Sequence, residues 1–137
     1  MLNKKTQYAF KALMYMAEHQ DDGPILIAEI AKNKNIPLKF LENILLELKN
    51  DGILDSKKGK GGGYFLRIPP SKIPLARIIR KIDGPIAMLP CVSLYFYERC
   101  KNCDEKNCGL HDTMILVRDA TLKILEKRTV ADLAKED

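Results

Sequence analysis

The chain has 137 residues, of which 46% are hydrophobic and 30% are charged. This length suits a single domain with a packed core, and the composition excludes a disordered or fibrous chain. No apolar run approaches the roughly 18 residues of a membrane-spanning helix, which excludes an integral membrane protein, and we expect the protein in the cytoplasm. The formal net charge is +5, and residues 1–100 hold the excess, with 16 basic and 10 acidic side chains. Either a polyanion binds to this part of the chain or its lysines form a solvated surface.

Apolar residues recur at helical spacing in three successive segments of the N-terminal part. The first segment covers residues 6–19 and ends at a turn cluster, residues 21–24. The second covers residues 26–34 and ends before Pro37, because the residue before a proline avoids helical angles. The third begins directly after this break. Two helices joined by such a tight break predict a helix-turn-helix.

A basic, glycine-rich hairpin is predicted after the third helix. In this prediction residues 53–54 form a short first strand, residues 57–63 form the tip, and residues 64–68 form the second strand. The lysines of the tip supply charge, and its glycines allow the main chain to approach a phosphate closely. The hairpin is either the wing of a winged helix-turn-helix or a solvated turn. A P-loop is disfavoured, because no Gly-Lys-Ser/Thr sequence opens a helix here.

Candidate DNA contacts follow from this arrangement, because the start of the second helix of a helix-turn-helix enters the major groove. Lys39 would meet phosphate or guanine, Glu42 would accept from cytosine, and Asn43 would pair with an adenine edge. Phe40 would touch a thymine methyl group or turn inward. The wing would add contacts to phosphates that do not depend on sequence. The predicted DNA-binding residues are Lys39, Phe40, Glu42, Asn43, Lys57, Lys58, Lys60 and Gly62.

The rest of the chain is predicted to hold a helix over 75–82, an irregular segment over 86–107 and a long helix over 110–126. The apolar face of the long helix is too wide for one neighbour. We expect it to meet both the first helix and the same helix of a second chain in a homodimer, the alternative being burial within one chain. The expected fold is mainly α with a small β-wing. Its parts are a winged helix-turn-helix region (1–83), a cysteine-containing sensor loop (84–109), and a dimerisation helix with a C-terminal turn (110–137).

Four cysteines and a histidine lie close together in the sensor loop and just after it. Their pattern is Cys91-x8-Cys100-x2-Cys103-x4-Cys108-x2-His111. In a cytosolic chain such clustering indicates metal binding or redox sensing more often than structural disulfides. Four thiolates, or three thiolates and an imidazole, can hold zinc or an iron–sulfur cluster. Zinc sites usually pair two Cys-x2-Cys units and this chain has one, so the spacing favours a cluster or reversible thiol oxidation, with zinc as an alternative.

Four runs of the sequence together resemble the Rrf2 family of bacterial winged-helix transcriptional regulators. They are IPLKFLENIL (36–45), KNDGIL (49–54), KGKGGGY (58–64) and IDGP (82–85). The resemblance covers nearly the whole chain. It implies a dimer through the long C-terminal helix that binds palindromic operators in double-stranded DNA. It also implies that Glu42 stands at the family's base-reading position and Lys58 at a wing position often held by arginine.

Cluster-binding members of this family use cysteines spaced Cys-x5-Cys-x5-Cys, in one type with a histidine three residues after the last. By this resemblance Cys91, Cys108 and His111 match the first, third and histidine positions. Cys100 and Cys103 are both candidates for the middle position, so a ligand set made of cysteines alone is a second alternative. The resemblance therefore implies a [2Fe-2S] or [4Fe-4S] cluster, although other members regulate without one.

These observations predict a homodimeric transcriptional regulator that acts as a repressor and senses redox or iron–sulfur status. The alternative is a cluster-free regulator of the same fold that responds to a partner protein, to thiol oxidation or to structural zinc. A thiol oxidoreductase is disfavoured, because the Cys-x2-Cys unit lacks a thioredoxin-like strand context. We therefore expect no enzyme activity.

Overall fold

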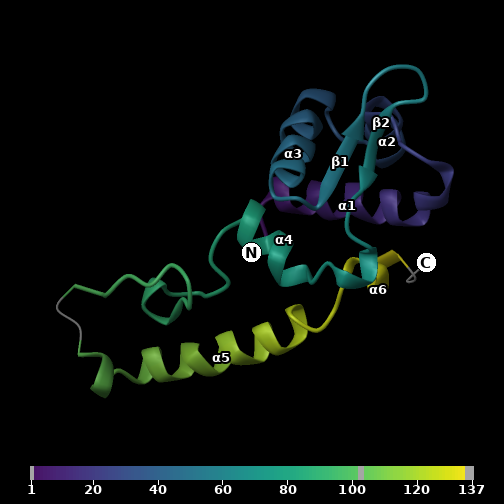
Figure 1. Ribbon diagram of the computed structural model, residues 1–137. Helices are drawn as coiled ribbons and strands as arrows, with labels where there is room; N and C mark the ends of the chain where they lie inside the picture. The colour runs from purple at the N-terminus through teal and green to yellow at the C-terminus, as the bar shows by residue number, and fades with distance from the viewer. Residues whose placement is uncertain (1, 102–103, 135–137) are drawn as a thin grey trace.

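The structure, a computed structural model, describes residues 2–101 and 104–134. Figure 1 shows a group of helices that carries a two-stranded hairpin, with a loop and a long helix extending to one side. The helices are α1 (Lys4–Glu18), α2 (Ile27–Lys34), α3 (Leu38–Asn50), α4 (Leu75–Ile82), α5 (Gly109–Leu125) and α6 (Val130–Ala134), and the strands are β1 (Leu54–Lys57) and β2 (Gly63–Leu66). The predicted class, mainly α with a small β-wing, is confirmed. Among the described helices, none is long and apolar enough to cross a membrane.

Helix α1 lies at the centre of the winged region and packs against α2, α3, α4 and α6. It begins after Asn3, whose side chain accepts a hydrogen bond from the backbone N–H of Thr6 at 2.8 Å and so caps the helix. Ala9 and Ala12 are fully buried, and their small side chains allow neighbouring helices to approach closely. Leu13, also fully buried, extends this face. The helical period seen in the sequence therefore marks the core.

The turn between α2 and α3 closes the helix-turn-helix. Asn35 adopts a left-handed conformation (φ 53°, ψ 52°), which asparagine tolerates better than most residues. The backbone N–H of Ile36 then bonds to the carbonyl of Ala31 at 3.0 Å, and the Ile36 side chain is buried. Helix α3 starts directly after Pro37. The predicted helix-turn-helix is confirmed.

The first strand of the hairpin is longer than predicted, and the hairpin is joined to the segment before α2. The strands β1 and β2 pair antiparallel, with Lys57 opposite Gly63, so Lys57 lies in a strand and not in the tip. Ile25 and Tyr64 add two backbone hydrogen bonds, each of 2.8 Å. Asp55 disfavours strand structure by itself, which is why the sequence indicated only residues 53–54. Pairing with the apolar second strand overrides that local preference.

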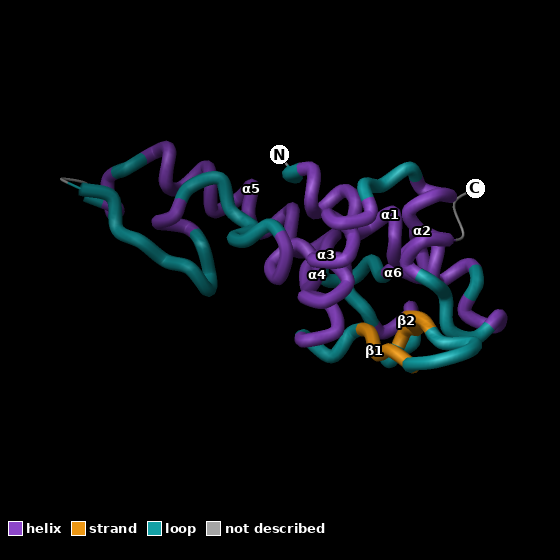
Figure 2. The backbone as a smooth tube through the Cα atoms, turned by 90° about the horizontal axis from the view of Figure 1, so that it is seen from above, coloured by secondary structure: helices purple, strands orange, loops and turns teal. Residues whose placement is uncertain are grey.

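The contact expected between the first helix and the long C-terminal helix is not among the main helix contacts of the single chain. Helix α5 packs mainly against α4 and a short 3₁₀ turn, Pro90–Val92, whereas α1 packs against α6. The reason is backbone pairing after α5: Leu75 N–H bonds to Arg128 O, and Val130 N–H bonds to Ile73 O, both at 3.0 Å. These bonds bring α6 back to α1 and leave α5 extending away from the winged region (Figure 2).

Tyr15 links α1 to α2 through a hydrogen bond that makes stability depend on alkaline pH. Its hydroxyl donates to Glu29 Oε2 at 2.6 Å, and its ring is buried. The hydrogen bond to the carboxylate and the burial of the ring raise the pKa of Tyr15 from 10.0 to about 12. Because the folded state holds this proton more tightly than the unfolded chain, the stabilisation is complete below pH 10.0 and is lost as the pH rises through about 12.

We therefore expect Tyr15→Phe to lower the free energy of unfolding near neutral pH by about 1 kcal/mol, the net contribution of one hydrogen bond. The difference between wild type and variant should shrink as the pH passes the ordinary tyrosine pKa. Urea unfolding at neutral and alkaline pH measures both effects. Tyr8→Phe is the control, because it keeps the ring against Phe40. A difference that stays constant with pH would contradict the assignment.

Candidate nucleic-acid interface and cysteine segment

The outer edge of α3 is polar and open to solvent. Lys39, Glu42 and Asn43 are exposed there, while Leu41 and Ile44 are fully buried on the opposite side. The helix therefore packs through its apolar stripe and leaves at its start the side chains that a major groove could receive.

Phe40 occupies an intermediate position between core and surface. Its ring meets the ring of Tyr8 edge to face, with centroids 5.6 Å apart, and 37% of the residue remains exposed. The ammonium group of Lys4 lies over the Tyr8 ring, 5.4 Å from its centroid. Phe40 thus fixes the start of α3 against α1 and still offers a partly exposed edge.

The tip of the wing is a tight turn shaped by glycines. Lys58 and Lys60 are exposed there, and Gly62 N–H donates to Gly59 O at 3.0 Å. A Cβ atom on Gly62 would lie 2.2 Å from the carbonyl oxygen of Lys57, so no side chain fits. The amide of Gly62 is used within the turn. This residue therefore shapes the tip, whereas the lysines present the charge.

A hollow of about 430 Å³ connects the recognition edge of α3 to the wing. Glu42 lines it from α3, and Lys57 and Lys58 line it from the hairpin. Leu26 and Leu38 also line it, although they are 61% and 45% exposed. The apolar period of the third helix predicted a buried Leu38, which is wrong, and Leu26 precedes α2 as its N-cap residue, where no period marks it. Their exposure provides apolar surface of the kind that contacts a thymine methyl group.

Contacts at the end of α3 fix its orientation. Arg77 of α4 donates to the Asp51 carbonyl oxygen at 2.8 Å and to Asp51 Oδ2 at 3.2 Å. The first bond satisfies a carbonyl at the helix C-terminus, where a positive charge is also favourable. Lys49 donates to Ser56 of β1 at 2.7 Å. Helix α3 and the wing are therefore held as one unit with α4.

The cysteine segment, residues 84–109, brings part of the predicted ligand set together. Cys91 is buried, and its Sγ lies 3.4 Å from Nδ1 of His111. Cys108 precedes α5, and its Sγ accepts a hydrogen bond from the backbone N–H of His111 at 3.4 Å. Cys100 is exposed, and Cys103 lies outside the described residues. The Cys91 thiol thus contacts the His111 imidazole at the start of α5, whereas the Cys108 thiol contacts only the backbone of His111.

These donors fit an iron–sulfur cluster or zinc in their chemistry, since both groups take thiolate and imidazole ligands. Within residues 2–101 and 104–134, no three side chains of His, Cys, Asp or Glu are grouped so that they could hold a metal ion. The Cys91–His111 pair could therefore hold part of such a group, and Cys108 and further donors would have to join it.

Two arginines attach the cysteine segment to the helices around it. Arg118 of α5 donates to the carbonyl oxygen of Val92 at 2.9 Å. Arg80 of α4 lies over the ring of Tyr95, 4.6 Å from its centroid, and pairs with Glu126 at 3.0 Å. Such contacts join residues far apart in sequence, so no local pattern indicated them.

Aromatic and aliphatic side chains remain exposed on the cysteine segment and on α5. The hydroxyl of Tyr97 donates to Glu105, and this hydrogen bond to a carboxylate raises the pKa of Tyr97. Along α5, Leu122 is the one residue classed as buried. The large exposed apolar residues of the two segments are Met88, Leu94, Tyr95, Phe96, Tyr97, Leu110, Leu116, Val117 and Ile124. The single chain therefore leaves an extended apolar surface uncovered.

Comparisons with known proteins agree on one family of regulators. The chain matches the family described as "Rrf2: Iron-dependent Transcriptional regulator" over residues 2–136. It is 38% identical to an rrf2-like HTH-type transcriptional regulator of Rhodobacter capsulatus, over 97% of this chain and 91% of that protein. It is 30% identical to the HTH-type transcriptional regulator IscR of Yersinia enterocolitica, over 96% and 77%. Among solved structures, CymR, the global cysteine regulator of B. subtilis, superposes with a TM-score of 0.82 at 28% identity, covering 100% of this chain and 98% of CymR.

Proposed function

Because the chain belongs to the Rrf2 family, and is therefore a DNA-binding transcriptional regulator and not an enzyme, we propose that it acts as a homodimeric repressor at palindromic operators. The exposed polar edge of α3 beside the basic wing supports this proposal most directly. In the proposed division of labour, residues 1–83 bind DNA, residues 84–109 sense the signal and residues 110–137 dimerise. A regulator of this kind works in the cytoplasm, where bacterial DNA lies.

In the proposed complex, α3 enters the major groove and the wing follows the phosphate backbone. Asn43 would pair with an adenine edge, Glu42 would accept from the amino group of cytosine, and Lys39 would meet guanine or phosphate. Lys58 and Lys60 would neutralise phosphates, which adds affinity without sequence preference. Gly62 shapes the tip that presents them.

The proposed dimer forms through the exposed apolar face of α5. Val117 is 38% exposed and Ile124 is 59% exposed, and these two residues lie seven positions apart on one face. Packing two such helices around a two-fold axis would bury both faces. A two-fold dimer presents two copies of α3, so its operator would be a palindrome with half-sites about one helical turn apart. Occupancy of a promoter by this dimer would exclude other proteins, which is why we propose repression.

The proposed signal enters through the cysteine segment. Cys91 and His111, whose side chains are in contact, would hold an iron–sulfur cluster together with Cys108 and with Cys100 or Cys103. When bound, such a cluster supplies a redox-active group that oxidants can convert or remove. The description of the matched family as iron-dependent supports this choice.

Contacts within the chain provide a route from the cysteine segment to the DNA-binding region. Arg118 ties the segment to α5 through Val92. Asp83 follows α4 and precedes the segment, and its Oδ2 accepts from Asn3 N–H at 2.9 Å and from Thr6 Oγ1 at 3.0 Å. A shift of the segment would therefore reach both α5 and the start of α1, and so alter the spacing of the two α3 helices by a shift of population.

One observation favours a second candidate, a cluster-free regulator of the same family. Among the residues that the structure describes, the cysteine segment shows a Cys91–His111 pair and no group of three donors. In this alternative, oxidation of the thiols, or zinc, changes the segment. The metal content of the purified protein separates the two candidates.

We expect the wild-type protein, purified without oxygen, to contain iron and sulfide and to absorb visible light. Cys91→Ser should lower the iron and sulfide content to about a tenth or less, because cluster ligands are thiolates. Iron, sulfide and zinc assays with an absorption spectrum measure this. Thr113→Ser near the start of α5 is the control, and Cys100→Ser and Cys103→Ser identify the middle ligand. One zinc per chain, or no metal at all, would support the cluster-free candidate.

DNA recognition is tested by selecting from random duplexes of about 30 base pairs, long enough for two half-sites. The proposal predicts enrichment of a palindrome. On that duplex, Lys58→Ala with Lys60→Ala should make the slope of log affinity against log salt less negative by about 1.8 per protomer. The loss should be similar for matched and mismatched duplexes, because phosphate contacts carry no sequence information.

The control is Lys72→Ala with Lys127→Ala, which removes the same charge from exposed positions outside α3 and the wing. Its salt slope should remain close to that of the wild type. Equal salt slopes for the two double variants would show that the wing lysines do not contact DNA phosphates. Selection that enriches no palindrome would contradict a two-fold complex.

A further inference from the structure

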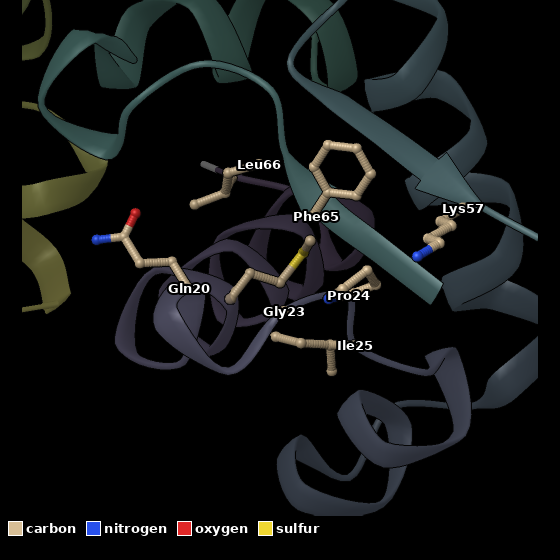
Figure 3. Close-up of a pocket in the computed structure, with 8 residues that line it drawn as sticks. Gln20, Gly23, Pro24, Ile25, Lys57, Phe65 and Leu66 are labelled. Carbon is tan, nitrogen blue, oxygen red and sulfur yellow. The ribbon is translucent and has the colours of Figure 1, made fainter. Parts of the chain in front are cut away.

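A second hollow, of about 400 Å³, lies between the C-terminal end of α1, the turn that follows it and the hairpin (Figure 3). Its size falls within the range of about 300–1,000 Å³ that is typical of small-molecule sites. Met16 and Ile25, which are 1% and 4% exposed, form part of its wall, and Pro24, Phe65 and Leu66 add apolar surface. The interior of this hollow is therefore apolar.

Two polar side chains stand at this apolar hollow, and both are exposed. Gln20 contributes an amide and Lys57 contributes an ammonium group, which Figure 3 shows directed toward Pro24. Within the described part of the chain, Lys57 forms no ion pair. The acidic residues Asp21 and Asp22 belong to the adjoining turn and do not line the hollow. A ligand with an apolar body and one negative charge would complement this lining.

Lys57 also lines the hollow between α3 and the wing. Its backbone is held in the strand pair opposite Gly63, so only its side chain can turn from one hollow to the other. One ammonium group cannot neutralise a ligand in the first hollow and a DNA phosphate beside the second at the same time. The two hollows therefore compete for a single charge.

We propose that the hollow formed by Met16, Gln20, Ile25, Lys57, Phe65 and Leu66 binds a small organic carboxylate with an apolar body, and that this ligand weakens DNA binding by withdrawing Lys57. The proposal of a binding site depends only on the geometry and lining of the hollow. The effect on DNA rests on the proposed function, in which the wing contacts phosphates. Carboxylates that carry an aromatic ring or a medium-length alkyl chain are the expected class.

Binding is tested on the full-length protein without DNA. Methyl resonances of Met16, Ile25 and Leu66 are followed by NMR during titration with 3-phenylpropionate and octanoate, with their uncharged amides, and with phenethylammonium. We expect the carboxylates to bind about tenfold more tightly than the amides, because a hydrogen bond between charged groups is worth roughly that much. Lys57→Gln should remove this difference and leave the binding of the amides unchanged.

Gln20→Trp is the variant that fills the hollow from an exposed position outside the proposed DNA surface. It should abolish the shifts caused by carboxylates and amides alike. Absence of methyl shifts with either carboxylate in the wild type would overturn the site. Equal affinity for carboxylate and amide, or tighter binding of phenethylammonium, would overturn its chemistry.

The coupling is tested by measuring affinity for the selected duplex at fixed salt with and without 3-phenylpropionate. Loss of one phosphate contact per protomer should weaken binding about fivefold for each protomer and make the salt slope less negative by about 0.9 per protomer. Gln20→Trp should bind DNA like the wild type and show no response to the ligand. A bound ligand that leaves DNA affinity unchanged would overturn the coupling, whereas failure to bind DNA without ligand would contradict the proposed function and leave the site standing.

Discussion

Replacement of Gly63 by alanine should destabilise the winged region by about 3 kcal/mol, combining backbone strain with a steric clash. Gly63 has φ +145°, a conformation that residues with a Cβ rarely adopt. A Cβ atom there would lie 2.4 Å from the carbonyl oxygen of Ile25 and 2.9 Å from its nitrogen. The backbone of Ile25 forms the two hydrogen bonds to Tyr64 that join the wing to the segment before α2. Relief of the clash would therefore separate the wing from the helix-turn-helix.

Gly61→Ala provides a matched control in the same hairpin. Gly61 also has a positive φ, +76°, but no atom lies within 4 Å of a Cβ built on it. This control should cost only the conformational strain, about 1 kcal/mol. Urea unfolding measures both variants, and binding to the selected duplex should fall much further for Gly63→Ala. Equal destabilisation by the two substitutions would show that the Ile25 contact does not hold the wing in place.

Replacement of Ile124 by aspartate should convert the proposed dimer to monomers. Ile124 is 59% exposed in the single chain, and in the proposed dimer it lies within the packed faces of two α5 helices. A carboxylate buried there without a partner would cost several kcal/mol, and two-fold symmetry applies that cost twice. The dimer dissociation constant should therefore rise about 100-fold or more. Sedimentation velocity at micromolar concentration measures the change, with circular dichroism to check the fold.

DNA affinity should fall together with dimerisation, because a monomer contacts only one half of a palindrome. Asp119→Asn on the same helix is the control: it also changes the charge by one unit, at an exposed residue away from Val117 and Ile124. It should leave the dimer intact. A variant Ile124→Asp that sediments as a dimer would rule out this face of α5 as the interface.

The wing shows where local sequence reasoning reached its limit. Gly62 and Gly63 were recognisable as parts of a hairpin tip, but the contacts that require glycine there involve Lys57 and Ile25. Asp55 disfavours strand structure, and it belongs to β1 because Phe65 pairs with it across the hairpin. Pairing across strands is a property of two segments together, so the sequence of one segment underestimates it.

The candidate sites also combine features that the sequence predicted with features that only the structure shows. The polar edge of α3 was predictable, because the side of a helix that carries its apolar residues determines the side left for solvent. The cysteine spacing indicated a ligand set, but not that Cys91 and Cys108 both meet His111, since the irregular loop between them has no period to read. The position of Lys57 between two hollows was likewise invisible, because each hollow is built from separate segments.

The amino-acid sequence by itself determined the helices, the helix-turn-helix, the basic hairpin and the family. These features depend on periodicity, turn residues and short motifs, which act between residues close together in the chain. Only the tertiary structure decided that α5 leaves the winged region and exposes Ile124, that α6 returns to α1, and that two arginines tie the cysteine segment to α4 and α5. Those outcomes depend on contacts between residues far apart in sequence, and such contacts form only when the whole chain has folded.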